Sequence, residues 1–352
     1  AARGMPEPQT ASAMRKKQQE EDALMQKYGG DRFIHRDSGQ LDLREITVND
    51  VVSVMPMMLD DDGNKARRGT LGAYETFRVK LTDGSTILYK QVAGEAEAET
   101  FTTTVDRILG LNITAGTAHN VLGMQAVFGK MGGRTDPKEL EDLIFKAHES
   151  MTKNNSYGKN FDQWERELRV GGRKGVGHVM EFCQPDCVDF LDAGASQINN
   201  LVQDFDKRQG IHKIALLDFI TGNRDRHPGN FMINNNNELV AIDNGFAGGT
   251  NPVTKEYDRS GIGKYVKGQM LHEAGPQYGN YGNVIDPRSI IQQGGGNRNT
   301  AKVEAMDIFD AQVTQETLDD LLAAGQLSGI TAKHTDLATI RANFEKHVDR
   351  IY

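Results

Sequence analysis

The stretch from residue 221 to residue 245 constrains this chain more than any other part of its sequence. It reads T-G-N-R-D-R-H-P-G-N-F-M-I, then a run of asparagines, then L-V-A-I-D-N-G. Two short apolar segments, 231–233 and 239–242, flank the Asn-rich residues 234–238, and asparagine tolerates the positive φ that tight turns need. The pattern predicts a helix that ends near Gly222, then a polar loop, then a β-hairpin.

Three side chains on this unit carry oxygen ligands: Asp225 and Asn230 in the loop, and Asp243 just after the hairpin. They are close enough in sequence to converge at the mouth of the loop. Mg²⁺ takes oxygen ligands, commonly one or two carboxylates together with phosphate oxygens, so Asn230 and Asp243 suit this metal. Asp225 can then face a substrate hydroxyl. The alternative interpretation is an Asx-rich turn with two capping aspartates and no catalytic role.

In order and spacing, the patterns D-x-x-x-x-N (225–230) and D-x-G (243–245) resemble the catalytic centre of the protein-kinase-like fold. Within that fold, the motif D-R-H-x-x-N followed by I-D-x-G is similar to the motifs of the phosphatidylinositol 3-/4-kinase-like superfamily of atypical kinases. It looks most like the type II phosphatidylinositol 4-kinase, actin-fragmin kinase and HipA-like branches. The resemblance implies an α+β, two-lobed protein-kinase-like fold with a small β-rich N-lobe and a mainly helical C-lobe.

The resemblance also implies an activity, which is transfer of the γ-phosphoryl group of ATP to a hydroxyl with Mg²⁺ or Mn²⁺ as cofactor. In such a mechanism Asp225 orients the acceptor hydroxyl and takes its proton, while Asn230 and Asp243 bind the metal on the phosphates. His227 is expected to support proton transfer or the charge of the transferring group. Arg226 is expected either to anchor the loop or to meet phosphate.

A strand of the N-lobe should supply a lysine that grips the α- and β-phosphates. Lys90 closes the apolar run after the turn at 83–84 and is the expected residue. An edge-strand lysine kept in water is the alternative. The following helix should supply an anionic partner for it. Glu97 and Glu99 both qualify, and Glu97 is preferred because an aromatic residue follows it four positions later.

Residues 177–185, G-H-V-M-E-F-C-Q-P, resemble the hinge that binds adenine through backbone groups, which places Glu181 and Cys183 at the nucleotide. A glycine-rich lid is less evident. The sequence G-T-L-G-A-Y at 69–74 precedes the first strand of the predicted hairpin but is not G-x-G-x-x-G. Neither a P-loop, an H-E-x-x-H nor a G-x-S-x-G motif occurs in the chain, which disfavours the sites that those motifs mark.

Hydrophobic periodicity predicts the main elements. They are a hairpin over 74–81 and 86–92, a helix over 95–110, two helices over 198–220, and a last helix capped by Thr335 or Asp336. We divide the chain into a flexible N-terminal arm at 1–41, partly helical between 11 and 28, an N-lobe at 42–178 with an insertion at about 129–177, and a C-lobe at 179–352.

Composition narrows the choice of partners. Lys and Arg number 41 against 49 Asp and Glu, which gives a net charge of −8 and no global basic field to hold nucleic acid. No run approaches the roughly 18 apolar residues of a transmembrane segment. Cys183 and Cys187 suit a reducing compartment, so we expect a cytoplasmic protein. The chain begins without Met or a signal-peptide run, which indicates a piece of a longer protein.

The acceptor has more than one candidate. A phosphoinositide would favour a basic loop after Asp243, and that region does contain four cations: Lys255, Arg259, Lys264 and Lys267. The acidic overall charge and the lack of a lipidation motif point instead to a protein substrate. A small-molecule phosphotransferase would use the same catalytic residues. A nucleotide-binding pseudokinase is disfavoured because the residues of the phosphate, base and metal sites are all present.

Overall fold

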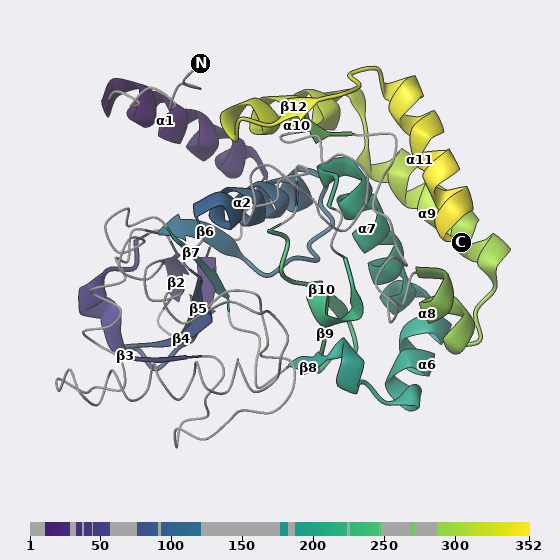
Figure 1. The fold of residues 1–352 in the computed structure, drawn as a ribbon, viewed down its shortest axis with the longest axis horizontal. Coiled ribbons are helices and arrows are strands. Elements are labelled where there is room, and N and C mark those ends of the chain that lie inside the picture. The colour runs from purple at the N-terminus through teal and green to yellow at the C-terminus, as the bar shows by residue number, and fades with distance from the viewer. Residues whose placement is uncertain are drawn as a thin grey trace, which may run out of the picture.

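The computed structural model describes residues 11–28, 33–36, 39–43, 45–56, 76–90, 93–120, 177–181, 187–223, 226–245, 247, 269–271 and 287–352. These ranges form a β-rich lobe and a mainly helical lobe that meet along helix α2 (Ala93–Ile108) (Figure 1). The predicted two-lobed α+β fold is therefore confirmed. The predicted lid at 69–74, the basic loop at 255–267 and the insertion up to residue 176 lie outside the described residues.

The N-lobe is a five-stranded antiparallel sheet with the strand order β3-β4-β5-β7-β6. Its strands are β3 Val51–Pro56, β4 Thr76–Leu81, β5 Thr86–Lys90, β6 Thr117–Asn120 and β7 Gly177–Glu181. Strands β4 and β5 are the predicted hairpin, and their paired residues Val79 and Ile87 are both fully buried. Gly84 takes the φ of +86° that the turn between them requires.

Helix α2 follows the hairpin as predicted, and it packs against β6, β7, α7 and α10. Apolar residues at helical spacing, among them Phe101, Val105 and Ile108, are buried on it. The loop after α2 is held by Asp106, which accepts hydrogen bonds from the backbone N–H groups of Ile113 and Thr114. Burial raises the pKa of this carboxyl, against the lowering effect of Arg107 and of these hydrogen bonds.

The C-lobe surrounds helix α7. Its helices are α6 Ala195–Gln203, α7 Phe205–Thr221, α8 Pro287–Gln293, α9 Arg298–Gln312, α10 Gln315–Leu327 and α11 Leu337–Ile351. Between Ile211 and Thr221 every residue of α7 except Lys213 is buried, as expected of a helix inside a core. The predicted last helix is α11, and Asp336 caps it by accepting from the N–H of Thr339 at 2.7 Å.

A second, three-stranded sheet with the order β10-β9-β8 lies in the C-lobe. Its strands are β8 Cys187–Asp189, β9 Phe231–Asn234 and β10 Leu239–Ala241, so the predicted Asn-rich hairpin is confirmed. Asn237 in its turn has a φ of +61°. The N–H of Ala241 donates to the carbonyl of Ile113 at 2.8 Å, which ties this hairpin to the loop after α2.

The first described element is helix α1 (Ala11–Tyr28), the part of the N-terminal segment predicted to be helical. It contacts α10 and α2 (Figure 1), and Lys27 Nζ lies 2.6 Å from Asp320 Oδ2.

A hairpin of β1 (Phe33–Arg36) and β2 (Gly39–Asp42) follows helix α1. Strands β11 (Gln269–Met270) and β12 (Thr331–Ala332) form a short parallel pair. Among the described helices, none has the length and apolar character needed to cross a bilayer.

His347 on α11 is an ionisable group inside the core. It is 2% exposed, and its ring lies 5.5 Å from that of Phe219 between centroids. Burial, together with the charge of Arg350, lowers the pKa of His347 to about 3. An unfolded chain protonates its imidazoles near pH 6.5. Between these two pH values the His347 imidazole binds a proton in the unfolded state but not in the folded state. The free energy of unfolding therefore falls as the pH drops from 6.5 towards 3.

We expect the natural protein to lose about 2 kcal/mol of stability through His347 between pH 6.5 and pH 5, at roughly 1.4 kcal/mol per pH unit. His347→Gln should lose less over the same interval, since an amide does not titrate. Urea unfolding of both proteins from pH 8 to pH 5 measures this, and the difference at pH 8 gives the cost of the substitution that is independent of pH. Parallel pH profiles would contradict the burial of a neutral imidazole.

Candidate active site

The loop between α7 and β9 carries most of the predicted catalytic residues. Helix α7 ends on Gly222, whose φ of +66° is the left-handed conformation that commonly closes a helix. Asp225, the predicted base, lies outside the described residues, and the loop is described again from Arg226 onward. At His227 a short helical turn begins, and Nδ1 of this residue accepts from the N–H of Gly229 at 3.1 Å.

Arg226 is the anchor of this loop. It is 3% exposed, and all five of its N–H donors are used. Nε and Nη2 donate to the carboxylate of Asp218, and Nη1 donates to the carbonyls of Asn230 and Ile242 at 3.0 and 2.8 Å. Nη2 also donates to Oδ1 of Asn244. Of its two expected roles, the structure shows Arg226 in the first, which is to hold the loop.

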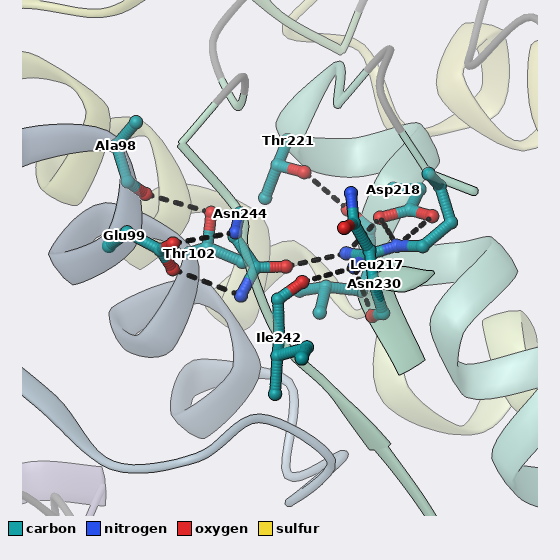
Figure 2. A network of polar contacts seen from close by, with 10 residues as sticks. Ala98, Glu99, Thr102, Leu217, Asp218, Thr221, Asn230, Ile242 and Asn244 are labelled. Atoms are coloured by element: carbon teal, nitrogen blue, oxygen red, sulfur yellow. Dashed lines mark hydrogen bonds and ion pairs between the residues drawn. The ribbon is translucent and has the colours of Figure 1, made fainter. Parts of the chain in front are cut away.

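Asp218 was not indicated by any motif, although it is essential to this arrangement. It lies on α7 and is fully buried, with its oxygens 2.8 to 3.2 Å from the guanidinium nitrogens. Figure 2 shows Asp218 on the same side of the polar network as Asn230. The signal in the sequence is an acidic residue in the middle of the apolar run A-L-L-D-F-I. A charge there requires a buried partner.

The structure brings two predicted site residues from different lobes into contact. Lys90, 7% exposed at the end of β5, places its Nζ 2.6 Å from Oδ1 of Asp243, which follows β10. Burial by itself would raise the pKa of Asp243. The adjacent Lys90, with His227 and Arg226 behind it, outweighs that effect and lowers the pKa below its usual range. Asp243 is therefore ionised, as a metal ligand must be.

His227 is neutral near pH 7. Burial lowers its pKa, the charge of Asp243 opposes that shift, and the charge of Arg226 adds to it. Because Nδ1 accepts from Gly229, the proton of the neutral ring is on Nε2. The side chain can thus donate one hydrogen bond without carrying a full positive charge.

Asn230 is 2% exposed and ends the short helical turn after His227. Its carbonyl accepts from the N–H of Ile242 at 3.0 Å, which places its backbone beside the residue that precedes Asp243. In the described part of the chain no group of three or more His, Cys, Asp or Glu side chains could hold a metal. One carboxylate and one amide nevertheless fit a Mg²⁺ whose remaining ligands are phosphate and water oxygens.

The acidic side chain that the structure brings to the centre of the site is Glu99. It is fully buried on α2, and its carboxylate accepts from the backbone N–H and from Nδ2 of Asn244 at 2.8 and 3.2 Å. Glu97 lies on α2 and Glu181 at the end of β7, but their side chains are outside what the structure describes, as is Cys183 altogether. Their roles at the nucleotide stay predictions.

The Asp218–Arg226 pair allows a test against a matched exposed pair. Arg341 and Asp310 form the same two-bonded contact, with side chains 44% and 46% exposed. Asp218→Asn leaves the Arg226 charge buried and uncompensated, so we expect it to cost about 3 to 5 kcal/mol in free energy of unfolding. Asp310→Asn should cost less than about 1 kcal/mol. Urea unfolding compares the two, and equal costs would contradict the anchoring role of the buried pair.

Comparisons with known proteins identify the family of the chain. The model of the phosphatidylinositol 3- and 4-kinase family matches residues 51–252, from β3 to beyond Asp243. No curated protein matches the chain. A solved structure described as that of the golgi casein kinase aligns with a TM-score of 0.34 and 14% identity, over 88% of this chain and 75% of that one. The family match covers more than half of the sequence and confirms the predicted superfamily: the chain belongs to the phosphatidylinositol 3- and 4-kinase family.

Proposed function

We propose that this protein transfers the γ-phosphoryl group of ATP to a hydroxyl group, and that the acceptor is a protein. The observation that carries the proposal is the 2.6 Å contact between Lys90 and Asp243. These two residues come from different lobes, and the family resemblance assigns one to the phosphates and the other to the metal. Their contact, next to the anchored loop of Arg226, supports a nucleotide site between the lobes.

The residues that would hold Mg²⁺ are Asp243 and Asn230. The side chain of Asp243 is 38% exposed, whereas Lys90 and Asn244 beside it are buried. When bound, Mg²⁺ supplies positive charge to the phosphate oxygens of ATP. Lys90 would grip the α- and β-phosphates, and the burial of its stem keeps its ammonium at this position.

Asp225 is the proposed base. It immediately precedes Arg226, whose guanidinium is fixed by Asp218. From there Asp225 orients the acceptor hydroxyl and takes up its proton as the new O–P bond forms. His227, neutral and protonated on Nε2, donates a hydrogen bond to an oxygen of the transferring group.

A protein acceptor is favoured over a phosphoinositide by charge. The net charge of −8 opposes approach to an anionic membrane surface. The low cysteine content favours a cytoplasmic location for this reaction.

The test is incubation with labelled ATP and Mg²⁺, in parallel with a protein extract, with phosphoinositide vesicles and with no acceptor. We expect label in protein, and at least about a hundredfold less label with Asp225→Ala, because a positioned base contributes on the order of 10² to 10⁴. Asp310→Asn serves as the control variant. Label in lipid alone would replace the proposed acceptor. ATP left intact in all three samples would leave a nucleotide-binding pseudokinase.

The metal assignment has its own test. Asp243→Asn turns one charged oxygen ligand into a neutral one, so we expect Mg²⁺-dependent ATP binding to weaken by roughly tenfold or more. Calorimetry measures the affinity with Mg²⁺ and again with a chelator, where the substitution should matter much less. Equal affinity of both proteins for ATP in Mg²⁺ would remove Asp243 from the metal site.

A further inference from the structure

We propose that Asn244 is a positioning residue that couples helix α2 to the conformation of Asp243, because Glu99 and Arg226 hold its side-chain amide from opposite sides. Asn244 is 2% exposed and lies between these two residues. Its Nδ2 donates to Glu99 and its Oδ1 accepts from Arg226. Figure 2 shows the amide of Asn244 directed at the carboxylate of Glu99 on one side and towards the Asp218 network on the other.

We call the hydrogen-bonded contact Glu99–Asn244–Arg226 the joint. Only a side chain with both a donor and an acceptor can occupy its middle position. Glu99 presents only acceptors and Arg226 only donors, so the residue between them must donate on one side and accept on the other. An aspartate at position 244 would lack the donor, and an apolar residue would lack both groups. The amide side chain of asparagine supplies one of each.

The backbone conformation of Asp243 depends on the hydrogen bonds that Asn244 makes to Glu99 and Arg226. Asp243 has a φ of +54°, a left-handed conformation that is unfavourable for a residue with a Cβ and persists where neighbouring residues are held. Ile242 is held by a bond from Arg226 to its carbonyl and by its own N–H to Asn230. On the other side, the N–H of Asn244 donates to Glu99 at 2.8 Å. Hydrogen bonds on both sides thus keep the carboxylate of Asp243 aimed at Lys90.

Glu99 belongs to α2, whereas Arg226 belongs to the C-lobe. A displacement of α2 would withdraw Glu99 from both donors of Asn244 and release one side of the left-handed turn. The position of α2 would then control whether Asp243 faces the metal. This inference rests on the proposed function only in naming Asp243 as the metal ligand, since the coupling between α2 and the turn is a property of the fold.

A reciprocal exchange of groups tests the joint. Glu99→Gln leaves one of the two donors of Asn244 without an acceptor, and Asn244→Asp sets two carboxylates against each other. The double variant restores a donor facing an acceptor, preserves the bond from Arg226 and keeps the net charge of the natural protein. We expect each single variant to lower kcat by roughly tenfold to a hundredfold and to raise the half-saturating Mg²⁺ concentration, and the double variant to recover to within about threefold.

Glu304→Gln is the matched control. Glu304 is a buried glutamate, 8% exposed, that pairs with Arg208 and His212 in the C-lobe. Its replacement should lower the melting temperature and leave the Mg²⁺ dependence of turnover unchanged. If Glu99→Gln behaves like this control, or if the double variant is no better than the weaker single variant, the coupling is wrong. Should a single variant fail to fold, Glu99→Asp, which keeps the charge and shortens the side chain, is measured by itself. It should lower kcat and raise the half-saturating Mg²⁺ concentration, and unchanged values of both would contradict the coupling.

A readout without ATP separates this inference from the proposed function. Hydrogen exchange of the backbone amide of Asn244 reports its bond to Glu99 directly. We expect exchange to be roughly tenfold faster in each single variant and restored in the double variant. Absence of ATP turnover by the natural protein would overturn the proposed function and leave this result valid. Unchanged exchange in the single variants would overturn the coupling even in an active enzyme.

Discussion

The buried guanidinium of Arg226 is the group on which the rest of the site depends. It binds three separate segments of chain: helix α7 through Asp218, its own loop through Asn230, and the turn after β10 through Ile242 and Asn244. A buried ion pair adds little net stability compared with apolar side chains of the same volume. Its contribution is geometric, because a planar fork with five donors fixes the distances and angles between the segments that it joins.

Most of the fold could be predicted because its signals are local. The Asn-rich turn, the apolar stripe of α7 and the aspartate cap of α11 each specify their own element. The partner of Asn244 could not be predicted in this way. Residues 97 and 99 are two positions apart on α2 and therefore fall on different sides of a helix, and the rotation of that helix is set by packing between the lobes. Glu99, Thr102 and Asp106 share one buried polar face at helical spacing, which a search for apolar periodicity passes over.

Helix α2 therefore has two kinds of buried surface. Its apolar residues join the common core, and its polar residues reach towards the C-lobe hairpin through Asn244 and through the loop that Asp106 holds. Apolar contacts tolerate small shifts, whereas buried hydrogen bonds do not. The hydrogen bonds of this polar face therefore fix the position of α2 relative to the C-lobe hairpin. The family match spans residues of both lobes, and this polar face explains how the two lobes are aligned.

Helix α1 has a consequence for the order in which the chain assembles. Lys27 and Asp320 are separated by 293 positions in the sequence, yet their side chains are bonded. In proteins most of the stability of a helix comes from tertiary packing, so α1 depends on the surface on which it docks. That surface includes α10, which leaves the ribosome long after α1 does. During synthesis α1 emerges well before α10, so we expect its docking on α10 to follow the emergence of most of the C-lobe.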